Sequence, residues 1–331
     1  MRSLSKSVMF QLGLAAVLSA QTGDVIGFGN FSHVVTNLEK SIAFYHDALG
    51  LDVATAPQAF SGNPAIMKMT NAIGAQSRIA VMKIPGAAFG LELIEYKDID
   101  RKPGNPRFQD PGAGNLALRV RDIDSVVERL RKANAHVLTL AGKPVEINGV
   151  EQGFFVHDPD GFIVELAQPI PLPPAPDPAS NVIGAGIEIT VADTDQTAKF
   201  YRDLLGFTMR VGDSFNGNKL MADTAGVPGA QFRQSSTTIP GNAPGTTVRL
   251  SMIEFKNTDR KPLETRVPDP GTALIQLRVR DIDALAKKLK AGGATVVAPD
   301  GEPVSIGAIK IAVVRDPNNL YLELISSPPA K

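Results

Sequence analysis

Apolar and polar side chains recur along the chain with two different spacings. The segments 30–35 (NFSHVV) and 115–120 (NLALRV) alternate every second residue, which is typical of β-strands. The segments 38–49 and 123–133 place apolar residues three to four positions apart and follow an amide or acidic capping residue, which predicts helices. Further strand-like segments lie at 77–84, 90–96, 153–158 and 162–168. This order predicts a module of one strand, one helix and about three more strands, twice in each half of the chain.

The two halves of the chain are copies of each other. The segment LRVRDID occurs verbatim at 118–124 and 277–283, an offset of 159 residues, while FSGN at 60–63 and FNGN at 215–218 are 155 residues apart. Such a nearly constant offset indicates an internal duplication with small loop insertions.

A proline-rich stretch separates the copies. AQPIPLPPAPDPASN, residues 167–181, contains six prolines, which favour extended geometry and cannot join the interior of a sheet. We therefore predict one domain at 27–168, a linker at 169–181 and a second domain at 182–328. A chain of 331 residues is long enough for two domains with separate cores.

The first twenty residues differ from the rest. Arg2 and Lys6 precede an apolar run from Val8 to Leu18, and small residues follow it. This order is typical of a signal peptide, and the run is too short to span a bilayer as a helix. We expect a signal peptide at 1–20, cleaved near residue 20, and an exported protein, either periplasmic or secreted. The alternative is a helical N-terminus.

Charge and composition exclude some classes of partner. Basic and acidic residues number 34 each, so no net charge attracts nucleic acid or anionic lipid. No second apolar stretch is long enough to be a membrane span, and the absence of cysteine fits an oxidising compartment. We expect a small organic ligand as the partner, no nucleic acid, and a pseudo-symmetric monomer or a homodimer.

The predicted helices and turns resemble those of a known family. NLEKSIAFYHDALGL (37–51) and DTDQTAKFYRDLLGF (193–207) are paired with VHDPDGFIVEL (156–166) and VRDPNNLYLEL (314–324). Together they resemble the glyoxalase, bleomycin-resistance and extradiol-dioxygenase group, the vicinal oxygen chelate superfamily. The resemblance implies an α+β fold of two tandem glyoxalase-like domains, each of paired βαβββ modules that form a cup-shaped sheet around a ligand.

In metal-dependent members of this group, the first strand of each module usually supplies a His and the last strand a Glu. Counting back from Phe44 as the resemblance implies gives Asn30, not His33. Side chains alternate between the two faces of a strand, so His33 lies on the face opposite to that of Asn30, beneath the helix. We therefore interpret His33 as a structural residue outside the cup. We call this alternation strand parity. The same counts give Glu92, Asn115 and Glu165 in the first half, and Gly186, Ser251, Leu274 and Glu323 in the second.

Parity and these counts together yield a set of residues that should line the cups. They are Asn30, Glu92, Asn115, Arg119, Glu165, Glu188, Gln276, Arg278 and Glu323. Carboxylates and amides without imidazole suit Mg²⁺, Mn²⁺ or Ca²⁺ better than Zn²⁺, Ni²⁺ or Fe²⁺. We expect no usual metal centre; the alternative is a weakly held divalent metal at Glu92 and Glu165 in domain 1. A structural role, with Arg119 paired to Glu165, is equally compatible with the sequence.

Two segments, 54–88 and 210–247, are long for loops and should contain strands plus a lid over each cup. The leading hypothesis is an exported protein that binds a small organic molecule in its cups. The competing hypothesis is a metal-dependent lyase, isomerase or dioxygenase that uses Glu92 and Glu165. A structural protein with filled cups is the third.

Overall fold

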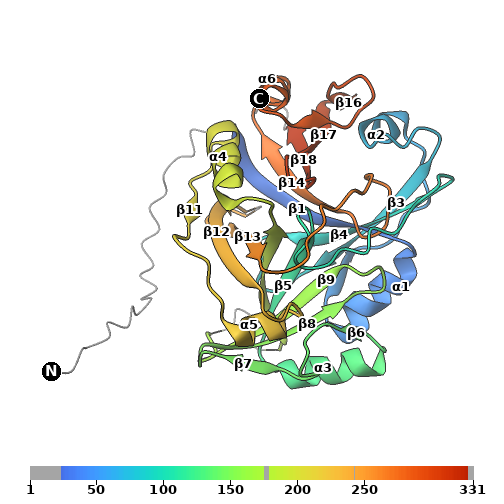
Figure 1. Ribbon diagram of the computed structural model, residues 1–331. Helices are drawn as coiled ribbons and strands as arrows, with labels where there is room; N and C mark the ends of the chain where they lie inside the picture. Colours follow the sequence, from blue (N-terminus) through green and yellow to red (C-terminus); the bar gives the residue numbers. More distant parts are fainter. Residues whose placement is uncertain (1–23, 175–178, 242, 327–331) are drawn as a thin grey trace.

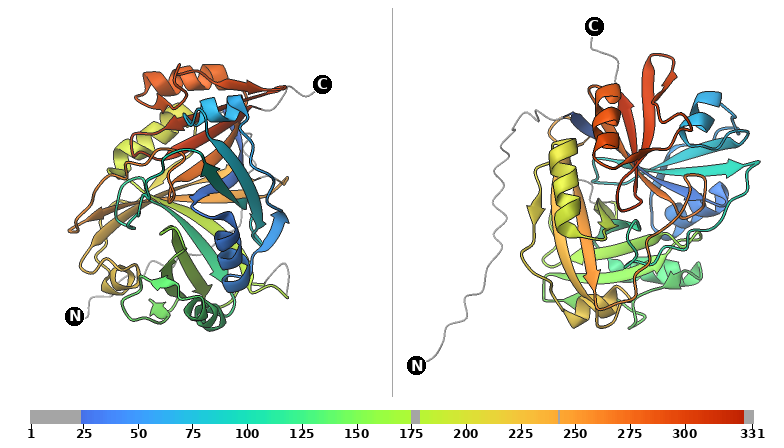
Figure 2. Two further views of the ribbon diagram at one scale, coloured as in Figure 1. Left: turned by 90° about the vertical axis from the view of Figure 1, so that its right-hand side faces the viewer. Right: turned by 45° about the horizontal axis from the view of Figure 1, so that its top comes forward.

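The computed structural model describes residues 24–174, 179–241 and 243–326 (Figure 1). The predicted signal peptide at 1–20 lies outside this part of the chain. None of the helices in the described part has the length and apolar character needed to cross a bilayer. Strands form two large curved sheets, and the longer helices lie along them (Figures 1 and 2).

Four modules follow one another, each beginning with a strand and a helix as predicted. Module 1 contains β1 (Val25–Val35), α1 (Leu38–Ala43), the π-helical turn η1 (Phe44–Ala48), β2 (Asp52–Thr55), α2 (Pro64–Met69), β3 (Gln76–Lys83) and β4 (Gly90–Lys97). Module 2 contains β5 (Gly114–Val120), α3 (Ile123–Lys132), β6 (His136–Val137), β7 (Val145–Ile147), β8 (Glu151–His157) and β9 (Ile163–Pro169).

The second half repeats this order. Module 3 contains β10 (Val182–Thr190), α4 (Thr194–Leu205), β11 (Arg210–Val211), α5 (Lys219–Thr224), β12 (Gln231–Pro240) and β13 (Thr247–Lys256). Module 4 contains β14 (Ala273–Val279), α6 (Ile282–Ala291), β15 (Thr295–Val296), β16 (Val304–Ile306), β17 (Ile309–Arg315) and β18 (Tyr321–Ser326). The α+β class and the βαβββ modules are thus as predicted.

The modules pair across the two halves of the chain. Sheet A joins modules 1 and 4 in the order β15-β17-β18-β14-β1-β4-β3-β2, and sheet B joins modules 2 and 3 in the order β11-β12-β13-β10-β5-β9-β8-β6. The first strands meet at each centre, β1 antiparallel to β14 and β10 antiparallel to β5. This corrects the expectation that the two modules of one half share a cup. Side-chain periodicity specifies each strand but not the strand that covers its free edge.

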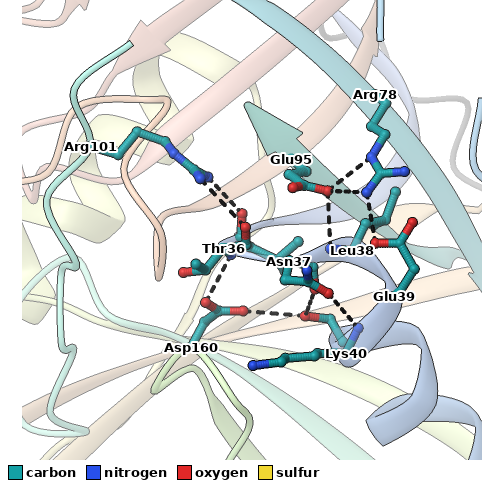
Figure 3. Close-up of polar contacts among 11 residues, drawn as sticks. Thr36, Asn37, Leu38, Glu39, Lys40, Arg78, Glu95, Arg101 and Asp160 are labelled. Carbon is teal, nitrogen blue, oxygen red and sulfur yellow. Dashed lines mark hydrogen bonds and ion pairs between the residues drawn. The ribbon is translucent and has the colours of Figure 1, made fainter. Parts of the chain in front are cut away.

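The beginning of α1 shows why the helices start where the sequence predicts (Figure 3). Asn37 caps the helix through its side chain. Glu95 Oε2 accepts the N–H of the first helical residue at 3.1 Å and hydrogen bonds from Arg78. Asp160, in the turn before β9, accepts the N–H of Thr36 at 2.9 Å. The last contact ties module 1 of sheet A to module 2 of sheet B.

Apolar residues form separate clusters on the two sides of each sheet. The largest cluster is shared by both sheets and includes Phe28, Tyr45, Leu118 and Tyr201 beside the helices. Smaller clusters occupy the other faces, around Met67 in sheet A and around the residues that surround a cavity in sheet B. We call these other faces the interiors of the two sheets. The shared core holds the two sheets in place, so the side chains that fill the interior of one sheet can differ in size from those of the other.

A short helix lies over each interior. In the segments predicted to hold strands plus a lid, α2 packs against β16 and β17, and α5 packs against β7 and β8. Asn63 and Asn218 cap them, and each helix spans from its own module to the partner module of the same sheet. The sequence analysis did not predict these helices, because each is only six residues long.

Candidate functional site

The interior of sheet B encloses a cavity of about 490 Å³. Strands β5, β9, β10 and β13 line one side, and residues of α5 line the other. Gly86, in the hairpin between β3 and β4, reaches this cavity from module 1. A cavity of this size can hold a small organic molecule.

Two carboxyl groups meet in this cavity. Glu165 comes from β9 and Glu188 from β10, on either side of β5. Asn115 on β5 donates its Nδ2 to Glu188 Oε2 at 3.1 Å and to Glu165 Oε2 at 3.4 Å. Strand register sets this arrangement, because Glu188 lies directly opposite Asn115 in the β10–β5 ladder.

The environment of the pair favours retention of a proton. Burial raises the pKa of both glutamates, and the charge of Glu188 raises the pKa of Glu165 further. Both shifts favour the protonated carboxyl, and the larger shift falls on Glu165. The cavity therefore holds two neighbouring carboxyl groups that are both easier to protonate than a glutamate in water.

Arginines and glycines line one end of the cavity. Arg119 on β5 and Arg249 on β13 both line the cavity and are exposed. Between them, β10 contributes Gly184 and Gly186. Burial raises the pKa of Glu151, which also lines the cavity, and the charge of Arg119 opposes this shift.

Aromatic rings form the other end of the cavity. The ring centroid of Phe108 lies 5.3 Å from those of both Phe155 and Phe255, and Phe232 belongs to the same cluster. Along β13 the lining residues run from Arg249 through a serine and an isoleucine to Phe255. The cavity thus changes from cationic to apolar along its length, with the carboxyl pair between.

The corresponding residues of sheet A form a closed hydrogen-bonded network. Gln276 donates its Nε2 to Glu92 Oε1 at 3.1 Å and to Glu323 Oε2 at 3.0 Å, and its Oε1 accepts the N–H of Asn30 at 2.9 Å. Ser32 donates to Glu92 at 3.1 Å. Burial raises the pKa of both glutamates, that of Glu323 to about 8, and the charge of Glu92 adds to the latter shift.

Larger side chains occupy the interior of sheet A. At the offset of 155 residues that relates the two lid segments, Met67 of α2 corresponds to Ala222 of α5. At the offset of 159 residues, Gln276 corresponds to Ala117. Met67 is buried in an apolar cluster, whereas Ala222 and Ala117 line the sheet B cavity. The duplication has therefore left one interior packed and the other hollow.

The equivalent arginines also differ. Arg278 corresponds to Arg119, but its guanidinium donates to the carbonyl of Gly241 at 3.0 Å. It also covers Gly27, where an added Cβ would lie 2.5 Å from the guanidinium. Arg278 thus acts as packing, while Arg119 is left facing the cavity.

The structure divides the predicted cup-lining residues between the two sheets. Sheet B contains Asn115, Arg119, Glu165 and Glu188; sheet A contains Asn30, Glu92, Gln276, Arg278 and Glu323. The predicted Mg²⁺, Mn²⁺ or Ca²⁺ site at Glu92 and Glu165 is therefore corrected, because β4 pairs with β1 in sheet A and β9 pairs with β5 in sheet B. Glu165 is also not paired with Arg119; it accepts a hydrogen bond from Asn115.

His33 lies outside both interiors, as the strand parity predicted. Its Nε2 is 2.8 Å from Asp158 Oδ2, and its ring stacks on Phe162 at 4.3 Å between centroids. His33, Asp158 and Asp160 bring three potential metal-ligating atoms within 4.8 Å of one another. The carboxylates already accept hydrogen bonds from backbone N–H groups, so this cluster serves the junction between the sheets.

The oxygen donors of the sheet B cavity are compatible with a hard divalent cation. Glu165 and Glu188 supply carboxylates, Ser251 supplies a hydroxyl, and Asn115 Oδ1 is buried without a hydrogen-bond partner. A half-turn of the amide would direct this oxygen at the carboxyl pair. The set fits Mg²⁺, Mn²⁺ or Ca²⁺, and it lacks the imidazole that Zn²⁺ sites commonly use.

Several lining residues escaped the sequence analysis. Arg249 lies two positions before Ser251, a predicted ligand position, so strand parity could have placed it in the same cavity. Glu151 gave no comparable signal, because it approaches the site only through the β8–β9 hairpin register, in which Glu151 lies opposite Pro169. The phenylalanines resembled ordinary core residues.

Comparison with known proteins agrees with the duplicated fold. The profile of the Glyoxalase/Bleomycin resistance protein/Dioxygenase superfamily matches residues 27–166 and again 185–324. A 2-epi-5-epi-valiolone epimerase from Actinomyces sp. is 32% identical over 101 residues, which cover 30% of this chain and 55% of the epimerase. A lactoylglutathione lyase from Arabidopsis thaliana is 34% identical over 98 residues, which cover 30% of this chain and 31% of the lyase. The matched region thus spans about half of the first relative and about a third of the second.

Solved structures share the arrangement over almost the whole chain. Glyoxalase I from Zea mays superposes with a TM-score of 0.56 at 17% identity and covers 91% of this chain and 92% of its own. A putative dioxygenase from Bacillus subtilis gives a TM-score of 0.53 at 14% identity, with 93% and 87% covered. At these identities the likeness establishes the fold alone. Because the superfamily profile matches both halves, the chain belongs to the Glyoxalase/Bleomycin resistance protein/Dioxygenase superfamily.

Proposed function

We propose that this protein binds a small organic molecule in the cavity of sheet B and that sheet A is its structural counterpart. The contrast between equivalent positions supports this proposal most strongly. Met67 and Gln276 occupy the interior of sheet A, while Ala222 and Ala117 leave space in sheet B. We also propose export from the cytoplasm, on the basis of the N-terminal sequence alone.

The binding proposal is tested by exchanging two equivalent residues, Ala222 in sheet B and Met67 in sheet A. A library of small organic acids, phenols and alcohols is screened by thermal shift on the full chain and on Ala222→Met. Ligands that raise the melting temperature of the full chain should lose this effect on Ala222→Met, because the new side chain occupies the cavity.

Met67→Ala is the matched control for this screen. It should lower the melting temperature but preserve the shift that a ligand causes, because it opens the other sheet. A library without any stabilising compound, or equal shifts on Ala222→Met and the full chain, would contradict binding in this cavity.

A second candidate is an enzyme of the lyase, isomerase or dioxygenase type that acts at the carboxyl pair. The neighbouring carboxyl groups of Glu165 and Glu188, whose pKa values are both raised by burial, support proton transfer, since a carboxyl with a raised pKa can act as an acid or a base near neutral pH. The names of the relatives, an epimerase and lactoylglutathione lyases, are consistent with such chemistry. Asn115, Glu165 and Glu188 would hold a divalent cation, which would polarise a substrate oxygen when bound.

Binding of Mn²⁺ distinguishes the metal-dependent candidate. The protein is dialysed against Mn²⁺ and chelator-treated buffer, and bound metal is measured by mass spectrometry. Stoichiometric metal that is lost in Glu165→Gln and Glu188→Gln but kept in Glu92→Gln would support it. Metal content below stoichiometry, or content unaffected by Glu165→Gln, would exclude a cation at this pair.

A further inference from the structure

The guanidinium groups of Arg119 and Arg249, at one end of the sheet B cavity, have no partner within the described part of the protein and can bind a ligand. Across residues 24–174, 179–241 and 243–326, the side chains of Arg119 and Arg249 form no hydrogen bond and no ion pair within 4.0 Å. Their charges act at longer range, on Glu151 and Glu188 respectively. Arg278, the counterpart of Arg119 in sheet A, is by contrast held by a backbone carbonyl. Arg119 and Arg249 therefore keep all their donors free for a bound molecule.

Strand geometry brings the two arginines to one opening. Arg119 lies opposite Gly184 across the β5–β10 ladder, and Arg249 lies on β13, on the other side of β10. A Cβ added at Gly186 would meet nothing closer than the carbonyl of Arg249 at 4.0 Å. Because Gly184 and Gly186 have no side chains, the space between the side chains of the two arginines stays open.

The far end of the cavity has the opposite character. Phe108, Phe155, Phe232 and Phe255 are all at most 8% exposed and line the cavity. Offset and edge-on aromatic contacts favour a planar guest among such rings. The residue equivalent to Phe155 in sheet A is Val313 and that equivalent to Phe232 is Ser77, so these two rings are present in sheet B and absent from sheet A.

We propose that the ligand of the sheet B cavity is a planar apolar molecule with an anionic group, which Arg119 and Arg249 bind while the four phenylalanines hold its rings. This inference rests on the proposed function and specifies its ligand class. A carboxylate and a phosphate offer the same chemistry to two guanidinium groups, and both suit their paired N–H donors. Between the two ends, the ligand passes the carboxyl pair, which recognises a neutral oxygen or hydroxyl.

Three naphthalene derivatives test the ligand class on the full chain. 2-Naphthoate and 2-naphthyl phosphate carry an anionic group, and 2-naphthamide is the neutral counterpart. The chain has no tryptophan, so naphthalene fluorescence reports binding directly. We expect at least one anionic probe to bind ten times more tightly than the amide or better, since charge-assisted hydrogen bonds distinguish them. The stronger of the two anions identifies the group as carboxylate or phosphate.

Variants assign the binding to the named residues. Arg119→Gln combined with Arg249→Gln should weaken the anionic probe at least tenfold and change amide binding less than twofold. Arg278→Gln in sheet A is the matched control and should leave both affinities unchanged. Ala222→Met should abolish binding of all three probes.

Three results would overturn the inference. They are equal affinity for the anionic probes and the amide, equal weakening of both by the double arginine change, and the absence of saturable binding by any probe. If library compounds bind in an Ala222-dependent manner and any of these results is obtained, the proposed function stands and the ligand class is wrong. If Ala222→Met leaves all binding intact, the cavity itself is not the binding site.

Discussion

His33 and Asp158 join the two sheets through a buried contact of 2.8 Å between Nε2 and Oδ2. The same carboxylate oxygen accepts the hydroxyl of Tyr45 at 3.0 Å. The duplicated junction repeats this pattern with Tyr201 and Asp316, 3.1 Å apart. These contacts fix the relative position of the sheets and lie away from the cavity.

His33→Ala should lower the free energy of unfolding by about 3 kcal/mol, because it removes the imidazole partner of the buried Asp158 carboxylate and leaves Tyr45 as the one side chain among the described residues that bonds it. Urea denaturation measures the loss. Naphthoate and Mn²⁺ binding should persist, since the side chain does not line the cavity. His46→Ala, at a half-exposed histidine, is the control and should change stability little. Loss of binding without loss of stability would place His33 in the site instead.

Glu323→Gln should make stability less dependent on pH. The pKa of Glu323 is raised to about 8 in the folded protein, so the folded state retains a proton that the unfolded state releases. Its contribution is present below the pKa of the unfolded chain and is lost as the pH rises through about 8.

Unfolding curves between pH 5 and 9 test this expectation. The variant should lose stability less steeply than the parent, by up to about 1.4 kcal/mol per pH unit, the effect of one proton. Glu302→Gln, at an exposed glutamate, should leave the slope as it is. Parallel curves for Glu323→Gln and the parent would show that Glu323 is ionised in the folded protein.

Gln276→Ala should be more destabilising than Gln234→Ala. Gln276 is 6% exposed and bonds Glu92, Glu323 and the N–H of Asn30, so its removal breaks three hydrogen bonds and leaves Glu92 with the hydroxyl of Ser32 alone among the described residues. A loss of about 2–4 kcal/mol is expected. Gln234 lines the open cavity and is exposed, so its removal should cost less than about 0.5 kcal/mol. Equal losses would mean that the network in sheet A is not closed.

Arg78→Gln should destabilise the protein by about 1–3 kcal/mol, because Glu95 is buried and loses its charged partner. Arg233 is the equivalent residue in module 3, but its guanidinium pairs with the exposed Asp195. Arg233→Gln should therefore cost at most about 1 kcal/mol. Thermal unfolding of the two variants gives the comparison, and a reversed order would contradict the role assigned to Glu95.

Local patterns were sufficient to predict the modules, the class of the fold and the face on which each polar residue lies. Strand parity placed Asn115, Arg119 and Glu188 on the cavity side, and His33 away from it. Sequence alone did not reveal that Glu92 and Glu165 belong to different sheets. Each first strand has two edges, and the residues within the strand do not specify which module covers the second edge.

The cavity escaped prediction for a different reason. Whether an interior is hollow depends on the volumes of facing side chains, and Ala222 or Met67 is equally compatible with a short buried helix. Comparison of the two copies makes the difference visible once the structure shows which positions face inward. The packed copy in sheet A therefore shows which side chains would have to change to fill the cavity of sheet B.

The crossed pairing of the modules makes this chain a natural candidate for fragment complementation. A cut in the proline-rich linker would produce two pieces, each with one half of both sheets and two uncovered central strand edges, β1 and β5 or β10 and β14. Neither piece can close a sheet by itself, so each should be insoluble or self-associated when produced alone. Mixed together, the two pieces should recover the cavity, which would make ligand binding a measure of their reunion.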